Sequence, residues 1–297
     1  MKFFTSQKSG FCFLFAGILS YGWLWPVMSM GVDYLPPLWF ATGRVFLGAR
    51  VLLAILAVRG ELKRPSRPDL PAILSVGFCM MGFYVSLVHT AMMFIPAGRG
   101  ALLGYSTPLW VAPAAVLIFR EKMTGMRVCG VVLGLSGLGI LFNPLELDWS
   151  DKGAWLGSGM CVLAAISWSI AILQMRGHKW HLTPLQLGPW QLLLATAVTL
   201  PFSIWVEDYR TPTWSIELCG LLLYGGAIGT ALGLWSIASA IQRLGALTTS
   251  VGLLGGPIVA LATSVMFLGE VLTLTLGTGL VLILGGIALV TLGERQN

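Results

Sequence analysis

Charged residues are scarce in this sequence. Asp, Glu, Lys and Arg make up 10% of the 297 residues, whereas soluble globular domains carry roughly 25%. Hydrophobic residues reach 56%, and the mean hydropathy is +0.84. So few charges must leave long uncharged runs, which excludes a soluble enzyme and an intrinsically disordered chain. The composition therefore predicts an integral membrane protein.

Cysteine is also rare, and its distribution excludes two further classes. The five cysteines lie singly in five different apolar segments, at Cys12, Cys79, Cys129, Cys161 and Cys219. No Cys-x-x-Cys or Cys/His spacing is present, which excludes a disulfide scaffold and a cysteine-based metal centre. We expect these thiols to pack as small apolar side chains, and we expect neither a metal nor another cofactor.

Acidic residues are absent from the middle of every apolar segment. The 12 Asp and Glu residues all lie in connections or at segment ends. Membrane enzymes that act on lipid-linked substrates usually cluster His, Asp or Glu at an interface, and proton-coupled carriers commonly use a buried carboxylate. Neither arrangement is visible here. His89 is the only histidine within a segment, where it could titrate near neutral pH, although a solvated histidine at a helix end is the simpler interpretation.

Ten apolar runs are close to the length of about 20 residues that a bilayer-spanning helix needs. They lack the polar–apolar alternation of membrane strands, so the predicted class is an all-α integral membrane protein. The predicted spans are 11–32, 38–58, 70–91, 98–119, 126–143, 153–173, 185–206, 216–239, 246–267 and 274–292.

The basic residues predict the orientation of these spans. Thirteen of the 18 Lys and Arg residues lie in regions on the same side as the N-terminus, and three lie on the opposite side. The remaining two, Arg44 and Arg50, lie within the second span. Because cytoplasmic connections carry the excess of basic residues, we expect a multi-pass protein of the cell inner membrane with both termini in the cytoplasm. The net charge of +6 then reflects topology, and nucleic acid is not an expected partner.

An internal repeat relates the two halves of the chain. The interval between Pro108 and Glu121 is the same as that between Pro257 and Glu270, so a single sequence offset relates the two pairs. The same offset aligns Gly77 with Gly226, Ala91 with Ala240, Thr124 with Thr273, and Gly130 with Gly279. These matches predict two five-span repeats, residues 1–147 and 148–297. Because five is odd, the repeats enter the membrane in opposite directions, which is the inverted architecture of secondary transporters.

A proline interrupts the fourth span of each repeat. A proline within a helix frees the carbonyl four residues before it, here at Gly104 and Leu253, and freed carbonyls in a membrane lie against protein or a wet cavity. We therefore expect Pro108 and Pro257 to have a structural or gating role, with a simple packing kink as the alternative. Glu121 and Glu270, which have the same expected role, follow these spans and could accept backbone N–H groups at the start of the next helix.

These features resemble the drug/metabolite transporter superfamily, specifically its ten-span EamA-type family. The resemblance rests on Pro108 with Glu121, on Pro257 with Gly269 and Glu270, and on the glycine-rich spans that follow each pair. The Pro-Pro-Leu sequence that opens the second span, together with Arg44, adds to it. The resemblance covers essentially the whole chain. It implies secondary transport without ATP, often the export of amino acids or related metabolites.

Arg44 is the strongest candidate for substrate binding, because a cation within a span is costly unless it faces the bundle interior. It could attract a substrate carboxylate, or it could be a structural partner of nearby carbonyls or carboxylates. Deep aromatic side chains could bind apolar groups or an ammonium, with lipid-facing or core packing as the alternative. The expected substrate-binding residues are Arg44, Tyr84, Tyr105, Ser106, Trp168, Gln191 and Trp235.

The sequence thus predicts a secondary transporter that exports an amino acid or an amino-acid-like metabolite by alternating access. Transport of a vitamin, nucleotide, sugar or cationic drug remains open as an alternative. A membrane enzyme acting on lipid-linked substrates is the alternative from another functional class. The expected partners are a small-molecule substrate and the lipid bilayer, and the oligomeric state is open, with a monomer compatible with the sequence.

Overall fold

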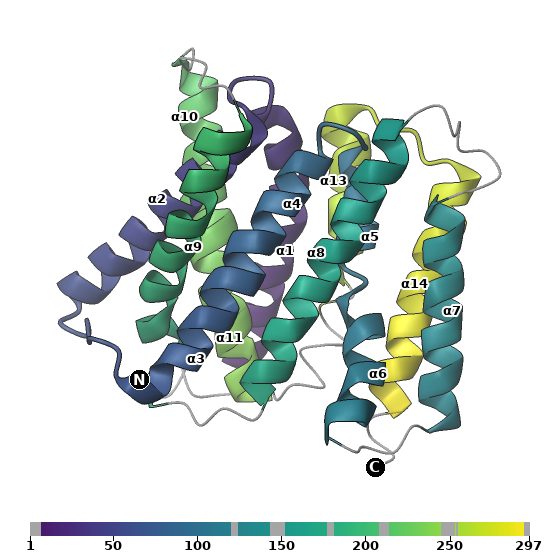
Figure 1. Ribbon diagram of the computed structural model, residues 1–297, viewed down its shortest axis with the longest axis horizontal. Coiled ribbons are helices and arrows are strands. Elements are labelled where there is room, and N and C mark those ends of the chain that lie inside the picture. Colours follow the sequence, from purple (N-terminus) through teal and green to yellow (C-terminus); the bar gives the residue numbers. More distant parts are fainter. Residues whose placement is uncertain are drawn as a thin grey trace.

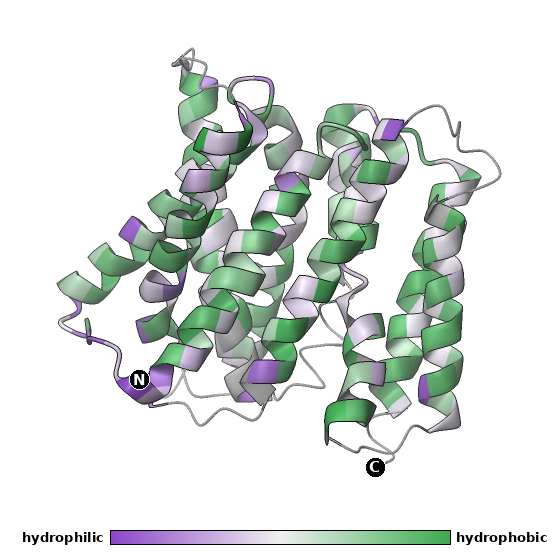
Figure 2. Cartoon of the chain, in the orientation of Figure 1, coloured by the Kyte–Doolittle hydropathy of each residue, from purple (hydrophilic) through white to green (hydrophobic). Residues whose placement is uncertain are grey.

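The computed structural model describes residues 7–119, 124–142, 152–176, 181–207, 214–244, 253 and 255–293. Every regular element in this part of the chain is a helix, which confirms the predicted all-α class. The helices lie side by side (Figure 1). Hydrophobic residues cover most of their length (Figure 2), as expected where lipid rather than water is the solvent.

Six helical runs are long and apolar enough to cross a membrane, by length and composition. They are Lys8–Gly31, Pro37–Val58, Arg67–Ala91, Lys152–Gln174, Pro184–Val206 and Ile216–Ile237. Shorter apolar helices occupy Gly125–Ile140, Gly255–Leu268 and Leu274–Val290. The predicted span 98–119 is divided into two helices.

The first half contains helices that follow the predicted spans closely. They are α1 (Gln7–Gly31), α2 (Pro37–Val58), η2 (Arg67–Asp69), α3 (Leu70–Leu74), η3 (Ser75–Phe83), α4 (Tyr84–Ala91), α5 (Ala97–Gly104), α6 (Thr107–Phe119) and α7 (Gly125–Phe142). Helices α3, η3 and α4 form one continuous run in which η3 has π-helical geometry. A proline begins α2, and another directly precedes α5. Proline suits a helix start because the N–H that it lacks would have no partner within the helix and its φ angle already matches that of a helix.

The second half of the chain is helical as well. It contains α8 (Lys152–Arg176), α9 (Pro184–Val206), α10 (Ile216–Leu223), η4 (Tyr224–Leu232), α11 (Gly233–Leu244), α13 (Gly255–Leu268) and α14 (Leu274–Gly293). The offset that aligns Pro108 with Pro257 also relates both ends of η3 to those of the π-helical segment η4, and the start of α7 to that of α14. The sequence offset is therefore reproduced in the boundaries of these elements.

Packing does not follow the order of the chain. Helices α1 and α2 pack against η4 and α10, with α11 and α13 also on α1, whereas α8 and α9 pack against α3 and η3, with α4, α5 and α6 also on α8. We call the first group bundle 1 and the second group bundle 2. The first two long helices of each half therefore pack against later helices of the other half.

Helices α7 and α14 form a separate close pair at the right of Figure 1. Glycines allow this approach: a Cβ atom at Gly286 would lie 2.6 Å from the Gly130 carbonyl oxygen and 2.5 Å from the Gly134 nitrogen. Small residues that bring backbones together are a common basis of helix association in membranes.

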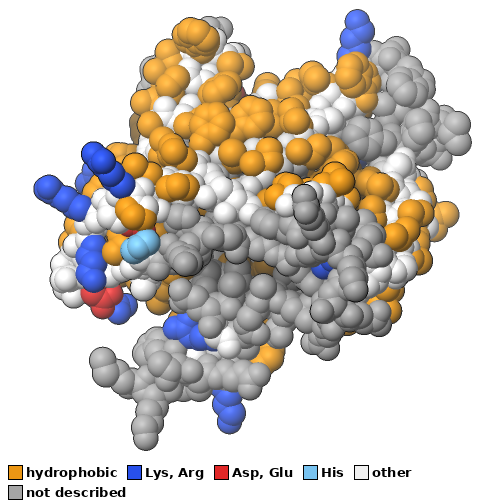
Figure 3. Space-filling view, turned by 60° about the horizontal axis from the view of Figure 1, so that its bottom comes forward, with side chains coloured by type: hydrophobic (Ala, Val, Ile, Leu, Met, Phe, Trp, Pro, Cys, Tyr) orange, Lys and Arg blue, Asp and Glu red, His pale blue; other side chains and the backbone are white. Residues whose placement is uncertain are grey.

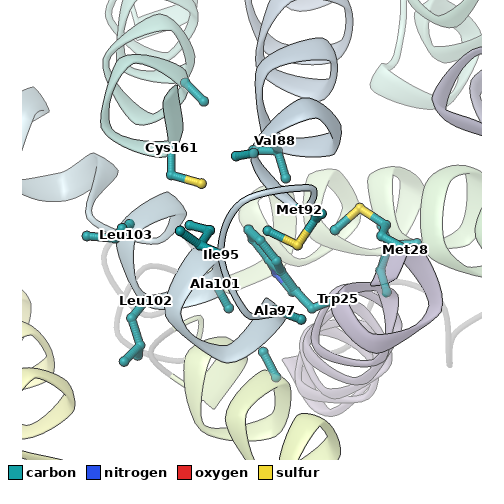
Figure 4. Packing of buried hydrophobic residues seen from close by; sticks show 14 of the residues in the cluster. Trp25, Met28, Val88, Met92, Ile95, Ala97, Ala101, Leu102, Leu103 and Cys161 are labelled. Carbon is teal, nitrogen blue, oxygen red and sulfur yellow. The ribbon is translucent and has the colours of Figure 1, made fainter. Parts of the chain in front are cut away.

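A large apolar core includes the region where α1 connects to α2 and α4 to α5, and it extends to residues of α7, α13 and α14. Trp25 and Met28 from the last turns of α1 meet Met92 and Ile95 from the α4–α5 connection (Figure 4). All four side chains are less than 9% exposed. Residues of α4, α5 and α8 complete the cluster, including Val88, Ala97, Ala101, Leu102, Leu103 and Cys161.

Candidate functional site

Arg44 lies seven residues into α2, about 10 Å along the helix from its start. Its side chain is only 4% exposed. The guanidinium Nε donates to His89 Nε2 at 3.1 Å, and Nη1 donates to Thr230 Oγ1 at 2.7 Å. Arg44 and Thr230 belong to bundle 1, and His89 belongs to bundle 2, so this group of polar side chains joins the bundles.

His89 is fully buried, so the interpretation as a solvated helix-end histidine is wrong. Its Nδ1 lies 2.8 Å from the Val85 carbonyl oxygen. A carbonyl requires a donor and the Arg44 Nε–H requires an acceptor, so these two bonds assign a neutral ring with the proton on Nδ1. The position in the last turn of α4 was predicted correctly, but the packing of α2 against α4 was not foreseen.

Thr230 was not predicted to belong to the site. It lies within η4, is 1% exposed, and donates from its hydroxyl to the Gly225 carbonyl at 2.6 Å. Nothing in the sequence distinguishes this hydroxyl from many others. The only related signal is the glycine-rich sequence before it, which permits close helix packing.

Aromatic side chains surround the same region. The Tyr84 and Trp168 rings pack edge to face with centroids 4.6 Å apart, and the Trp25 and Tyr105 centroids are 6.3 Å apart. The Tyr84 hydroxyl interacts electrostatically with Arg44 and with Tyr105. The structure thus brings together four of the predicted binding residues, Arg44, Tyr84, Tyr105 and Trp168, from α2, α4, the α5–α6 connection and α8.

The break in the predicted fourth span lies at Tyr105 and Ser106, between α5 and α6. Pro108 is therefore the second residue of α6, where a missing N–H is tolerated, and does not interrupt a helix. The Gly104 carbonyl accepts from the Thr107 hydroxyl at 3.3 Å. Ser106 is fully buried, donates to the Leu103 carbonyl and accepts from the Trp110 indole, so its only proton is already used.

Pro257 likewise lies in the first turn of its helix, α13, rather than in a helix interior. The Leu253 carbonyl, which we expected to be free, accepts from the Gly256 backbone N–H at 2.9 Å. A Cβ atom at Gly256 would lie 2.9 Å from the Tyr105 ring, so this glycine leaves room for the aromatic side chain.

Gln191 and Trp235 lie away from Arg44. The Gln191 side chain is 3% exposed and donates to the Ala72 carbonyl at 3.3 Å, within bundle 2. Trp235 packs edge to face on Phe13, with centroids 5.3 Å apart, and the Arg243 guanidinium covers the same Phe13 ring at 4.7 Å. Trp235 therefore belongs to an aromatic group between α1 and α11.

Glu270 caps a different helix from the one we expected. Its carboxylate accepts from the Gly98 backbone N–H at 3.1 and 3.2 Å, in the first turn of α5, while the Thr273 hydroxyl caps the following helix, α14. Burial raises the pKa of the Glu270 carboxyl, and the Gly98 and Ala97 backbone N–H groups partly offset this rise. Glu121, the corresponding residue of the first repeat, lies outside the described residues.

A second carboxylate has the same function at α2. Both oxygens of Glu207, directly after α9, accept from the Leu38 backbone N–H at 3.0 Å, and one accepts from Trp39 at 3.3 Å. Burial raises the pKa of this carboxyl too, against the effect of the two N–H donors. The N-cap residues of α2 and α5 are prolines without a capping side chain, so a carboxylate from the other bundle supplies the missing acceptor.

The chain is similar to known proteins in family, in sequence and in structure. The family described as "EamA-like transporter family" matches residues 8–143 and 155–292. A protein of Bacillus subtilis (strain 168), "Uncharacterized transporter YoaV", is 27% identical over 269 residues, covering 91% of this chain and 92% of its own. "Probable amino-acid metabolite efflux pump" of Salmonella typhimurium is 25% identical over 305 residues, covering 98% and 97%.

Two further matches complete the comparison. "Probable terminal-alkyne amino-acid exporter" of Streptantibioticus cattleyicolor is 24% identical over 284 residues, covering 94% of this chain and 93% of its own. One crystal structure aligns with a TM-score of 0.66 at 20% identity, over 98% of this chain and 99% of that chain. The match shows that a solved structure has a similar helical fold.

Proposed function

The chain belongs to the EamA-like transporter family, and on this premise we propose that it exports an amino acid or an amino-acid-like metabolite by alternating access. Membership of this family implies a small-molecule substrate and a location in a lipid bilayer. The substrate class, the direction and the binding residues are our proposal. Relatives named as an amino-acid metabolite efflux pump and an amino-acid exporter support the substrate class.

The observation that carries the proposal is the buried, unneutralised charge of Arg44. Its two hydrogen-bond partners, His89 and Thr230, are neutral, and no carboxylate among the described residues forms an ion pair with it. A guanidinium has five N–H donors, so two bonds leave most of its capacity for a ligand. A buried guanidinium of this kind favours an anionic group that can bind in the guanidinium plane, such as a carboxylate.

The aromatic side chains support a substrate with an apolar part. Tyr84, Tyr105 and Trp168 each keep part of their surface accessible although they lie between helices. Aromatic walls bind apolar groups through burial, and their faces attract an ammonium. A carboxylate on Arg44 with an ammonium or an apolar side chain against these rings describes an amino acid. The same positive charge disfavours a cationic drug.

The repeated boundaries support ten spans arranged as two inverted five-span repeats, residues 1–147 and 148–297. Under this proposal α5 and α6 together form the fourth span. Several polar contacts between the bundles lie near the upper end, where Glu207 and Glu270 cap α2 and α5 and the Thr42 and Ser203 hydroxyls meet at 2.8 Å. Two further hydrogen bonds join α9 to the connection after α2, at the other end of these helices. With the apolar core of Figure 4, the contacts at the upper end are those of a state closed there.

The distribution of basic residues supports an orientation with the upper end outside. Figure 3, which brings the lower side of Figure 1 forward, shows Lys and Arg side chains spread over that face. The connection after α2, which lies at the lower side of Figure 1, contains four basic residues, Arg59, Lys63, Arg64 and Arg67. The positive-inside rule then places this face in the cytoplasm of an inner-membrane protein, with both termini on that side.

The proposal is tested by ligand binding followed by flux. A thermal-shift panel on detergent-purified protein contains amino acids, their amides, a nucleotide, a sugar and a cationic dye, and the compounds that bind are then used in liposome counterflow. We expect Arg44→Gln to reduce amino-acid counterflow by at least about tenfold, since a buried charge partner is lost. Arg50→Gln is the matched control, because Arg50 is exposed on the same helix.

Two results would contradict the proposal. A stabilising shift from the nucleotide, the sugar or the dye, without one from any amino acid, would show that the substrate class is wrong. Amino-acid counterflow that is equal in Arg44→Gln and Arg50→Gln would show that Arg44 does not bind the substrate.

A further inference from the structure

The two π-helical segments occupy equivalent positions in the two halves of the chain. Segments η3 (Ser75–Phe83) and η4 (Tyr224–Leu232) have the same length and are related by the offset of the sequence repeat. A π-helical register shifts the hydrogen bonds from i−4 to i−5 and is frequent at functional sites. Each segment leads to a residue of the Arg44 site: Tyr84 directly follows η3, and Thr230 lies within η4.

The hydrogen bonds of Thr230 have a fixed direction. Its hydroxyl donates to the carbonyl of Gly225, five residues earlier, at 2.6 Å. A threonine hydroxyl has one proton, so the same oxygen can only accept in its 2.7 Å contact with Arg44 Nη1. Within η4 the Thr230 proton is thus used by the carbonyl five residues earlier, which leaves the hydroxyl oxygen as an acceptor for the guanidinium.

Backbone contact between α2 and η4 brings this short side chain within reach of Arg44. A Cβ atom at Gly226 would lie 2.9 Å from the Arg44 carbonyl oxygen, and one at Gly48 would lie 3.0 Å from Thr230 Cγ2. Any larger side chain at either glycine would push the helices apart. The glycines and Thr230 therefore form one arrangement around Arg44.

We propose that Thr230 is a positioning residue that determines carboxylate selectivity. With His89 holding Nε and Thr230 holding one N–H of Nη1, the guanidinium plane is fixed, and the second N–H of Nη1 and both N–H groups of Nη2 remain for the substrate. Without the Thr230 acceptor, the guanidinium can rotate and loses its preset geometry for a planar, two-oxygen ligand. This inference rests on the proposed function, since it assumes that the substrate carboxylate binds Arg44.

The experiment compares Thr230→Val, which has nearly the same shape without the hydroxyl, with Thr230→Ser, which keeps it. Thr199→Val is the matched control, because Thr199 is fully buried and its hydroxyl bonds only within its own helix. The probes are L-phenylalanine and L-phenylalaninamide, which differ in the carboxylate. Half-saturation concentrations are measured by counterflow, and apparent affinities by thermal shift.

We expect Thr230→Val to raise the half-saturation concentration of L-phenylalanine about tenfold, as for loss of one hydrogen bond to a charged group, while that of the amide changes little. Thr230→Ser should restore most of the selectivity, and Thr199→Val should retain it. Selectivity is the ratio of the half-saturation concentrations of the amide and the acid. If Thr230→Val keeps this selectivity while Arg44→Gln loses it, the role of Thr230 is overturned and the proposed function remains intact.

A second readout does not depend on the substrate. The rate at which phenylglyoxal modifies Arg44, followed by mass spectrometry, should rise several-fold in Thr230→Val and stay unchanged in Thr199→Val, because a released guanidinium is more reactive. Equal rates in the two variants would overturn the inference even if neither probe is transported. This measurement needs no substrate. It therefore tests the role of Thr230 even if the proposed function fails, and the counterflow of Arg44→Gln tests the proposed function separately.

Discussion

At the scale of single residues, the contacts of His89 determine how the site responds to protons. Its Nε2 accepts from Arg44 at 3.1 Å, and its Nδ1 is bonded to the Val85 carbonyl. A second proton on the ring would have to enter at Nε2, where it would replace the acceptor of a guanidinium N–H and face a cation directly. The geometry therefore favours a permanently neutral His89.

We expect transport to be nearly independent of pH between about 6 and 8, the range in which an ordinary histidine titrates. His89→Gln should keep the flux, because the glutamine oxygen can replace Nε2 as the acceptor. His89→Leu should reduce it, since Arg44 then loses a partner. Initial counterflow rates over this pH range test both. A flux that titrates near pH 6.5 in the native chain but not in His89→Gln would mean that His89 does take up protons.

The sequence predicted the residues of the site that stand out chemically. Arg44 was recognisable as a cation within an apolar span, and Tyr84, Tyr105 and Trp168 as deep aromatic residues. Thr230 was not, because its importance comes from a π-helical register that no local pattern reveals. Gln191 was also among the expected binding residues, but its side chain bonds to the Ala72 carbonyl instead.

At the scale of elements, the carboxylate caps connect the two bundles to the helices of the site. Glu207 caps α2, which carries Arg44, and Glu270 caps α5, which ends next to Tyr105. Both carboxylates come from the opposite bundle. The apolar runs predicted where these helices start, but the capping carboxylates lie in the other half of the chain, so only the folded packing identifies them.

Gly98→Ala tests the cap of α5. A Cβ atom at Gly98 would lie 2.6 Å from Glu270 Oε2, so the carboxylate must withdraw, and the loss of a cap costs about 1 kcal/mol. We expect a lower apparent Tm in detergent. Gly159→Ala is the control, because that helical glycine has open space around it and the change should be neutral or stabilising by up to about 1 kcal/mol. Equal Tm values would contradict the role of the cap.

Combining Gly98→Ala with Glu270→Ala separates the lost cap from simple crowding. If both substitutions act by removing the same hydrogen bonds, the double variant should melt close to the less stable single variant. Additive losses would show that Gly98 and Glu270 act independently.

At the scale of the whole molecule, the exchange of helices between the halves is the feature that the sequence did not reveal. The repeat was recognisable from residues such as Pro108 and Pro257, and its offset recurs in η3 and η4. Hydrophobic spans of similar composition, however, carry little information about which neighbour they choose in a membrane, because lipid is as apolar as leucine. Close contacts between glycines, such as Gly130 with Gly286, become apparent only after folding.

Helices α2 and α9 pack closely together although we assign them to different bundles. Under the proposed alternating access the bundles part at the upper end, which would separate Thr42 from Ser203, whose hydroxyls lie 2.8 Å apart there. A disulfide in Thr42→Cys/Ser203→Cys should therefore hold that end closed. We expect oxidation to stop counterflow and dithiothreitol to restore it. The native chain, with its five free cysteines, and the Thr42→Cys single variant, both oxidised in the same way, should continue to transport. If the cross-linked double variant transports as fast as the same variant in dithiothreitol, the bundles do not part at this position during the cycle.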